Sequence, residues 1–106
     1  MFSGLINRLS QKHIYACMCV AESRGIGPYP LGEKHALIAM IKAHEKDVED
    51  SLGALLANNG WMNAELQGAK KLDHPFQSED RAMMDAYSAA AEGRGGLIVY
   101  QDPIRD

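Results

Sequence analysis

One amphipathic helix with an apolar run on either side of it most constrains how this chain can fold. We expect this helix over residues 45–58. Acidic side chains near its start interact favourably with the helix dipole, and Asn59-Gly60 supplies a left-handed ending. Its buried stripe comprises Val48, Leu52, Leu55 and Leu56. A half-exposed strand is expected directly after it, over residues 61–72, with Trp61 on the polar face and Leu66 on the apolar one. A helix with such a stripe must bury it against another element, which predicts a domain that packs helices on a sheet.

The first apolar run, residues 13–22, has two largely apolar faces and is expected to form a central strand. A loop rich in glycine and proline follows over residues 23–32. Residues 35–43 can form a second strand or the first part of one helix over residues 33–59. A continuous helix would be about 40 Å long and would overhang a small domain. The strand is therefore favoured.

Two more elements complete the pattern. Ser78 fits the N-cap of a second helix, which ends at the glycines of residues 93–96, and residues 97–100 are expected to form a strand buried on both faces. The order strand, strand, helix, strand, helix, strand predicts an α+β two-layer sandwich, in which two helices cover one face of a four-stranded mixed sheet. The first two strands should pair antiparallel, and each strand–helix–strand step should join parallel strands. The ingredients resemble those of ferredoxin-like sandwiches, although the order of the elements differs.

The whole chain, residues 1–106, is expected to be a single compact domain. Residues 1–12 form either a short amphipathic helix or a frayed lead-in. Hydrophobic residues make up 46% and charged residues 24%, which is typical of globular proteins and argues against disorder. A chain of 106 residues can also bury a core without disulfides or a metal.

Charge and hydropathy exclude two classes of partner. The formal net charge is −3 and no basic stripe occurs, so we expect no nucleic-acid partner. No apolar run is long enough to span a bilayer, so we expect no membrane partner. On a strand, Cys17 and Cys19 would lie about 6.6 Å apart, which disfavours a disulfide between them. Free thiols favour a cytoplasmic location.

His13, Cys17 and Cys19 share one face of the first strand with Tyr15. Thiolates and an imidazole can bind Zn²⁺ or Cu(I), but structural zinc sites use a second ligand pair, which this sequence lacks. We therefore expect no metal and no cofactor, and buried thiols in their place. The sequence contains no phosphate-binding glycine loop and no recognisable catalytic set. It leaves catalysis undecided and favours a protein that is not an enzyme.

The loop over residues 24–30 is the best candidate for a binding site. Two glycines and two prolines shape it, and Arg24 and Tyr29 are residue types that recognition sites often use. Histidines and a tyrosine from the neighbouring strands can converge on it. The candidate binding residues are therefore Arg24, Tyr29, His13, Tyr15 and His35.

Two functions are compatible with these features. The first is a small non-enzymatic binding or regulatory module, an adaptor or immunity-type inhibitor that recognises a protein partner. This module would be a homodimer, because a second, uncovered sheet face would be too apolar for water. The alternative cover for that face is the N-terminal segment folding back over it. That face would carry Tyr15, Cys17, Cys19, Leu37, Ala39 and Ile41. The second function is a small-molecule sensor or enzyme with a pocket between the open sheet face and the 24–30 loop, where His13 or His35 would act as acid or base.

Overall fold

The structure is a computed structural model that describes residues 11–105. Within them the chain forms β1 (His13–Ser23), β2 (Lys34–Ala43), the 3-10 turn η1 (Glu45–Asp47), α2 (Val48–Asn58), β3 (Trp61–Lys71), α3 (Arg81–Ala91) and β4 (Gly96–Val99). The α+β class and the predicted order of strands and helices are confirmed. Most of the lead-in expected over residues 1–12 lies outside the described residues. No helix in the described part of the chain is long and apolar enough to cross a membrane.

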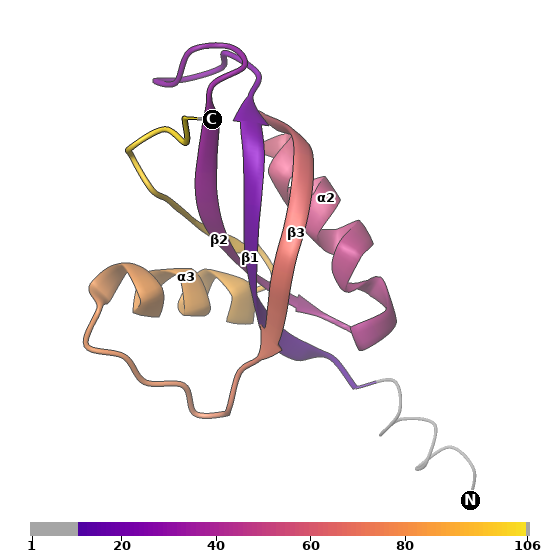
Figure 1. Cartoon of the computed structure of the whole chain (residues 1–106). Coiled ribbons are helices and arrows are strands. Elements are labelled where there is room, and N and C mark those ends of the chain that lie inside the picture. Colours follow the sequence, from indigo (N-terminus) through magenta and orange to yellow (C-terminus); the bar gives the residue numbers. More distant parts are fainter. Residues whose placement is uncertain (1–10, 106) are drawn as a thin grey trace, which may run out of the picture.

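The strands form one sheet in the order β3-β1-β2-β4, and Figure 1 shows α3 lying across one end of it. Every neighbouring pair is antiparallel, so the expectation of a mixed sheet is wrong. β2 and β3 run parallel to each other, but β1 lies between them. β3 and β4, the strands before and after α3, run in opposite directions at the two edges of the sheet. The expectation that a strand–helix–strand step joins parallel strands is therefore wrong for β3, α3 and β4.

Residues 34–43 form a strand and not part of a long helix. β2 pairs with β1 without interruption, from His13 opposite Ala43 to Glu22 opposite Lys34. Side chains on both faces of β2 are buried, which explains why its sequence has no polar face. The favoured strand assignment is therefore confirmed.

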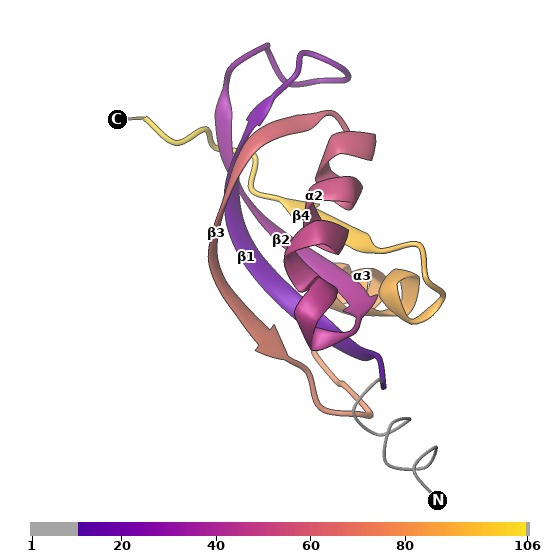
Figure 2. The same ribbon diagram turned by 90° about the vertical axis from the view of Figure 1, so that its right-hand side faces the viewer.

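The two helices pack on opposite faces of the sheet, and not on one face as expected. The odd-numbered residues of β1 and β2 face α2, in a cluster that includes Leu52 and Leu56 of that helix. On the other face, Met40 contacts α3 through Ala86 and Ala90. Apolar residues occupy both faces of β1 and β2, so each face needs its own cover. The sheet is strongly twisted, and β4 runs at a steep angle to β3 (Figure 2).

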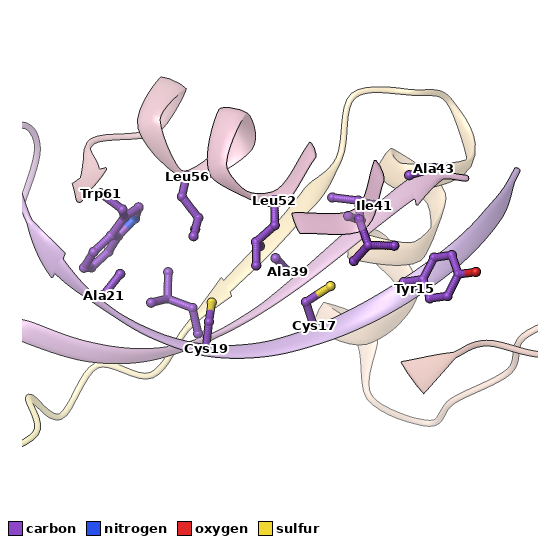
Figure 3. Packing of buried hydrophobic residues seen from close by; sticks show 12 residues of the cluster. Tyr15, Cys17, Cys19, Ala21, Ala39, Ile41, Ala43, Leu52, Leu56 and Trp61 are labelled. Carbon is purple, nitrogen blue, oxygen red and sulfur yellow. The ribbon is translucent and has the colours of Figure 1, made fainter. Parts of the chain in front are cut away.

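The sheet face beneath α2 consists mostly of small side chains. Leu52 and Leu56 point from α2 towards β1 and β2 (Figure 3). Most of the side chains beneath them are short: Cys17, Cys19, Ala21, Ala39 and Ala43. Short side chains let the helix approach closely and let its leucines fill the core.

The same packing overturns the prediction of an open apolar sheet face. The residues expected there, Tyr15, Cys17, Cys19, Leu37, Ala39 and Ile41, are at most 8% exposed in the single chain. α2, and not a second copy of the chain, covers the face that was expected to be open. The open part of the sheet lies on the opposite face, beyond α3, where Met18 is 58% exposed.

β3 departs from simple alternation. Its register against β1 shifts twice, and Asn63 adopts a positive φ of 51° within the irregular stretch. The shift between Val20 and Glu22 of β1 brings Trp61 and Leu66 of β3 onto the same side, towards α2, although the sequence placed them on opposite faces. Trp61 is buried and not on a polar, exposed face.

Two boundaries also differ from expectation. Asp80, and not Ser78, caps α3, because the Asp80 side chain accepts a hydrogen bond from the backbone N–H of Ala82 at 2.9 Å. The Ser78 hydroxyl accepts one from the N–H of Asp80 at 3.1 Å, two residues earlier. β4 is an edge strand, and Leu97 to Val99 are half-buried and not enclosed on both faces.

Candidate functional site

Three rings meet beneath the 24–32 loop, at the end of the sheet where α2 stops. The centroid of the Tyr29 ring lies 4.5 Å from that of His35 and 5.6 Å from that of Trp61, and the His35 and Trp61 centroids are 5.7 Å apart. We call these three residues the aromatic cluster. His35 comes from the start of β2 and Trp61 from the start of β3, while Tyr29 folds back onto both from the loop.

Both ring nitrogens of His35 are engaged. Nδ1 lies 2.8 Å from the carbonyl oxygen of Tyr100, and Nε2 lies 2.7 Å from Oε1 of Glu33. A carbonyl oxygen only accepts, so Nδ1 donates to it, and Nε2 pairs with the carboxylate as a salt bridge when the imidazole is charged. The ring is 0% exposed. His35 therefore ties β2 to the residue that follows β4, and neither of its nitrogens faces a ligand.

Backbone and hydroxyl hydrogen bonds fix the loop over the aromatic cluster. The Ser23 hydroxyl donates to the carbonyl oxygen of Tyr29 at 3.0 Å and accepts from the N–H of Gly25 at 3.0 Å. The N–H of Arg24 donates to the carbonyl oxygen of Gly60 at 2.8 Å. Gly25 has a φ of 79°, a conformation that strains other residues. The loop is thus anchored at both ends and at Tyr29.

A pocket of about 240 Å³ lies between this loop, the end of α2 and β4. It lies there because α2 packs mainly on β2 and β3 and not on β4. Its apolar lining includes Ile26, Pro28, Tyr29, Trp61, Leu97 and Val99. Such a lining suits a small apolar or aromatic molecule.

The structure brings together some of the predicted binding residues and separates others. Tyr29 and His35 are in contact, and Arg24 is exposed on the same loop. His13 and Tyr15 lie near the other end of β1, and roughly 25 Å of strand separates Tyr15 from the loop. Burial raises the pKa of Tyr15, and the nearby carboxylate of Glu45 raises it further. The five residues therefore do not form one site.

Trp61 belongs to the candidate site but was not predicted from the sequence. Regular alternation placed it on the polar face of its strand, and a register shift of β3 changes that alternation. Two signals could have drawn attention to it. Trp61 is the only tryptophan of the chain and follows a glycine turn, and tryptophan buries more surface than other residue types.

The thiols lie away from the aromatic cluster, beneath α2. Cys17 and Cys19 are free, and both are buried. Burial raises the pKa of Cys17 to about 11, with a smaller contribution from Cys19, and burial also raises the pKa of Cys19. Buried thiols of this kind are poor nucleophiles. Across residues 11–105, His, Cys, Asp and Glu side chains form no group of three or more that could hold a metal ion.

Comparisons of the chain with protein-family models, with curated proteins and with solved structures gave no match.

Proposed function

We propose that this chain is a small non-enzymatic module that binds a protein partner through the 24–32 loop. The observation that carries the proposal is the exposure of two aliphatic side chains on this loop. Ile26 is 65% exposed and Leu31 is 71% exposed. Apolar side chains held in water on an ordered loop are typical of recognition surfaces.

The anchoring of the loop supports this role. The hydrogen bonds of Ser23 and Gly60 hold the loop in one conformation before any partner arrives, so little conformational entropy is lost on binding. Exposed Arg24 lies two residues before Ile26 on the same loop and adds a charged, planar group of the kind that interfaces favour. The partner should therefore offer an apolar patch with a carboxylate at its rim.

The test compares proteins that bind the immobilised wild-type chain and the double variant Ile26→Ser/Leu31→Ser. Quantitative mass spectrometry should identify a protein enriched on the wild type and lost from the double variant. That protein is then purified, and its affinity for both chains is measured by calorimetry. We expect a stoichiometric complex with the wild type and a loss of affinity of about 100-fold in the double variant, because two interface side chains lose their apolar contact.

Met18→Ser is the matched control, since Met18 is similarly exposed but lies on the sheet face away from the loop. This variant should bind as the wild type does. The proposal is wrong if no protein distinguishes the wild type from the double variant, or if Met18→Ser weakens binding as much as the loop variant does.

A second candidate function rests on the pocket beneath the loop. Its walls of Tyr29 and Trp61 suit a small aromatic ligand, as a sensor of such molecules would require. Trp61 is the single tryptophan, so its fluorescence reports on this pocket directly. Saturable quenching by indole or phenol that Tyr29→Ala weakens would support the sensor. Unchanged fluorescence up to the solubility limit of both probes would count against it.

We also propose a cytoplasmic location. Free Cys17 and Cys19 support it, because a reducing compartment keeps thiols in this form.

A further inference from the structure

The free edge of β4 can pair with another strand, and this interaction does not depend on the function of the loop. We propose that two copies of this chain pair antiparallel along β4, with Ile98 opposite Ile98 of the second copy, so that their sheets join into one. A second copy is the occupant because this edge is complementary to itself.

Two residues of β4 direct their backbone groups away from the sheet. The N–H of Tyr100 donates to the carbonyl oxygen of Ala36 at 3.0 Å, which makes this pair a hydrogen-bonded one. Such pairs alternate in antiparallel ladders, so the backbone groups of Ile98 also point towards β2. Leu97 and Val99 therefore turn their N–H and C=O groups to the outer side, where β4 has no neighbouring strand among residues 11–105.

The two edges of the sheet differ in how they are protected. β3, at the opposite edge, carries two register shifts and the charged residues Glu65, Lys70 and Lys71, which discourage pairing with another strand. β4 is uncharged and unbroken from Gly96 to Val99. The edge that is open to strand addition is therefore β4.

Hydrogen bonding selects the register. If Leu97 of one copy lies opposite Val99 of the other, the two residues of this pair exchange two backbone hydrogen bonds. The two-fold axis repeats the pair, which gives four hydrogen bonds in all. Ile98 then lies opposite itself on the axis. The same register brings the Arg94 end of one strand to the Asp102 end of the other. The Arg94 guanidinium, which also binds Glu92 of its own chain, then faces the carboxylate of Asp102.

A hollow beside the edge accommodates the second copy. About 440 Å³ of space lies between α3 and β4, and its lining on the helix comprises Ala82, Asp85, Ala86 and Ala89. Ile98 lines the same space. In the proposed register, the side chain of Ile98 from the second copy enters this hollow. The alanines also let the two α3 helices approach each other across the axis.

The first test is a disulfide across the axis, in the full-length chain treated with diamide. Ile98→Cys places two cysteines in a non-hydrogen-bonded pair, with Cα atoms about 4.5 Å apart. This separation allows a disulfide, so a covalent dimer should form in most of the protein. Native Cys17 and Cys19 are at most 2% exposed and do not compete in the folded chain.

Leu97→Cys is the matched control. In this register its two copies are offset by two residues along the strand, so their Cα atoms lie about 8 Å apart, too far for a disulfide. We expect little covalent dimer. A dimer that forms equally well through Leu97→Cys would overturn the proposed register.

The second test removes an outward hydrogen bond. Val99→Pro deletes an N–H that points away from β2, so the β2–β4 ladder is kept and circular dichroism should show a folded chain. Each dimer loses two of its four edge hydrogen bonds, and sedimentation equilibrium should show a dissociation constant at least about tenfold higher. Val99→Thr has a similar shape, keeps the N–H and should remain a dimer.

The proposal is overturned if the wild-type chain stays monomeric from micromolar to submillimolar concentration. It is also overturned if Val99→Pro and Val99→Thr dimerise equally. The loop variant Ile26→Ser/Leu31→Ser should remain a dimer, which separates this test from the test of the proposed function.

Discussion

Gly96 of β4 lies directly against Ala86 of α3. A Cβ atom at Gly96 would come within 2.5 Å of both the Cα and the carbonyl oxygen of Ala86. The obstacle is backbone, which cannot move aside as a flexible side chain can. The contact therefore requires glycine, and it sets how closely α3 packs on the edge strand.

Gly96→Ala should destabilise the fold through this contact. We expect the free energy of unfolding to fall by about 3 kcal/mol or more, because the added methyl group forces the helix away from the strand. Urea denaturation measures the change. Gly68→Ala is the control, since it also adds a methyl group within a strand but meets nothing within 4 Å. The interpretation fails if both variants change stability equally.

Loss of the His35 side chain should also lower the free energy of unfolding. His35→Ala leaves Glu33 and the carbonyl oxygen of Tyr100 without their hydrogen-bond donor and opens a cavity beside Trp61. We expect a loss of about 2 to 3 kcal/mol in the free energy of unfolding. Arg24→Ala, on the exposed loop, should change it by about 0.5 kcal/mol or less. Near-equal effects in chemical denaturation would show that the ring does not secure β4.

The core beneath α2 predicts a contrast between two leucines. Leu56 is 1% exposed, whereas Leu31 is 71% exposed. Leu56→Ala should cost about 2 to 5 kcal/mol through lost burial and the remaining cavity. Leu31→Ala should be neutral within about 0.5 kcal/mol, because its side chain is already in water. A large loss of thermal stability in Leu31→Ala would mean that the loop supports the fold.

Stability should fall in alkaline solution because of Cys17. Its pKa is raised from 9.0 to about 11 by burial first and by Cys19 second. Below pH 9 the thiol is protonated in both states, so it causes no change. Between pH 9 and 11 the unfolded chain loses the proton while the folded chain keeps it, and the free energy of unfolding falls by about 1.4 kcal/mol per pH unit.

Comparison with Cys17→Ala isolates this effect from other groups that titrate in the same range. Urea denaturation at several pH values should give a steeper decline for the wild type than for the variant. Parallel declines over the window would show that the thiol has the same pKa in both states.

The helices could be predicted from the sequence because their apolar residues recur at helical spacing, whereas β1 and β2 could be predicted because each is a short apolar run. The sheet face that each helix covers could not be predicted, because Ile14 and Tyr15 are both apolar and α2 could have packed on either side of β1. The site was predicted in part, through Tyr29 and His35. Trp61 was missed because a register shift has no signal in an alternating pattern, and Asn63 gives no warning of its positive φ.

The small side chains beneath α2 limit how this protein can change. Cys17 and Ala39 lie opposite each other at 0% exposure, in the same buried cluster as the leucines of α2. A longer side chain at either position must be matched by a shorter one at Leu52 or Leu56. Related chains should therefore vary at the strand and the helix together, and a designer who wants a larger core must begin by moving α2.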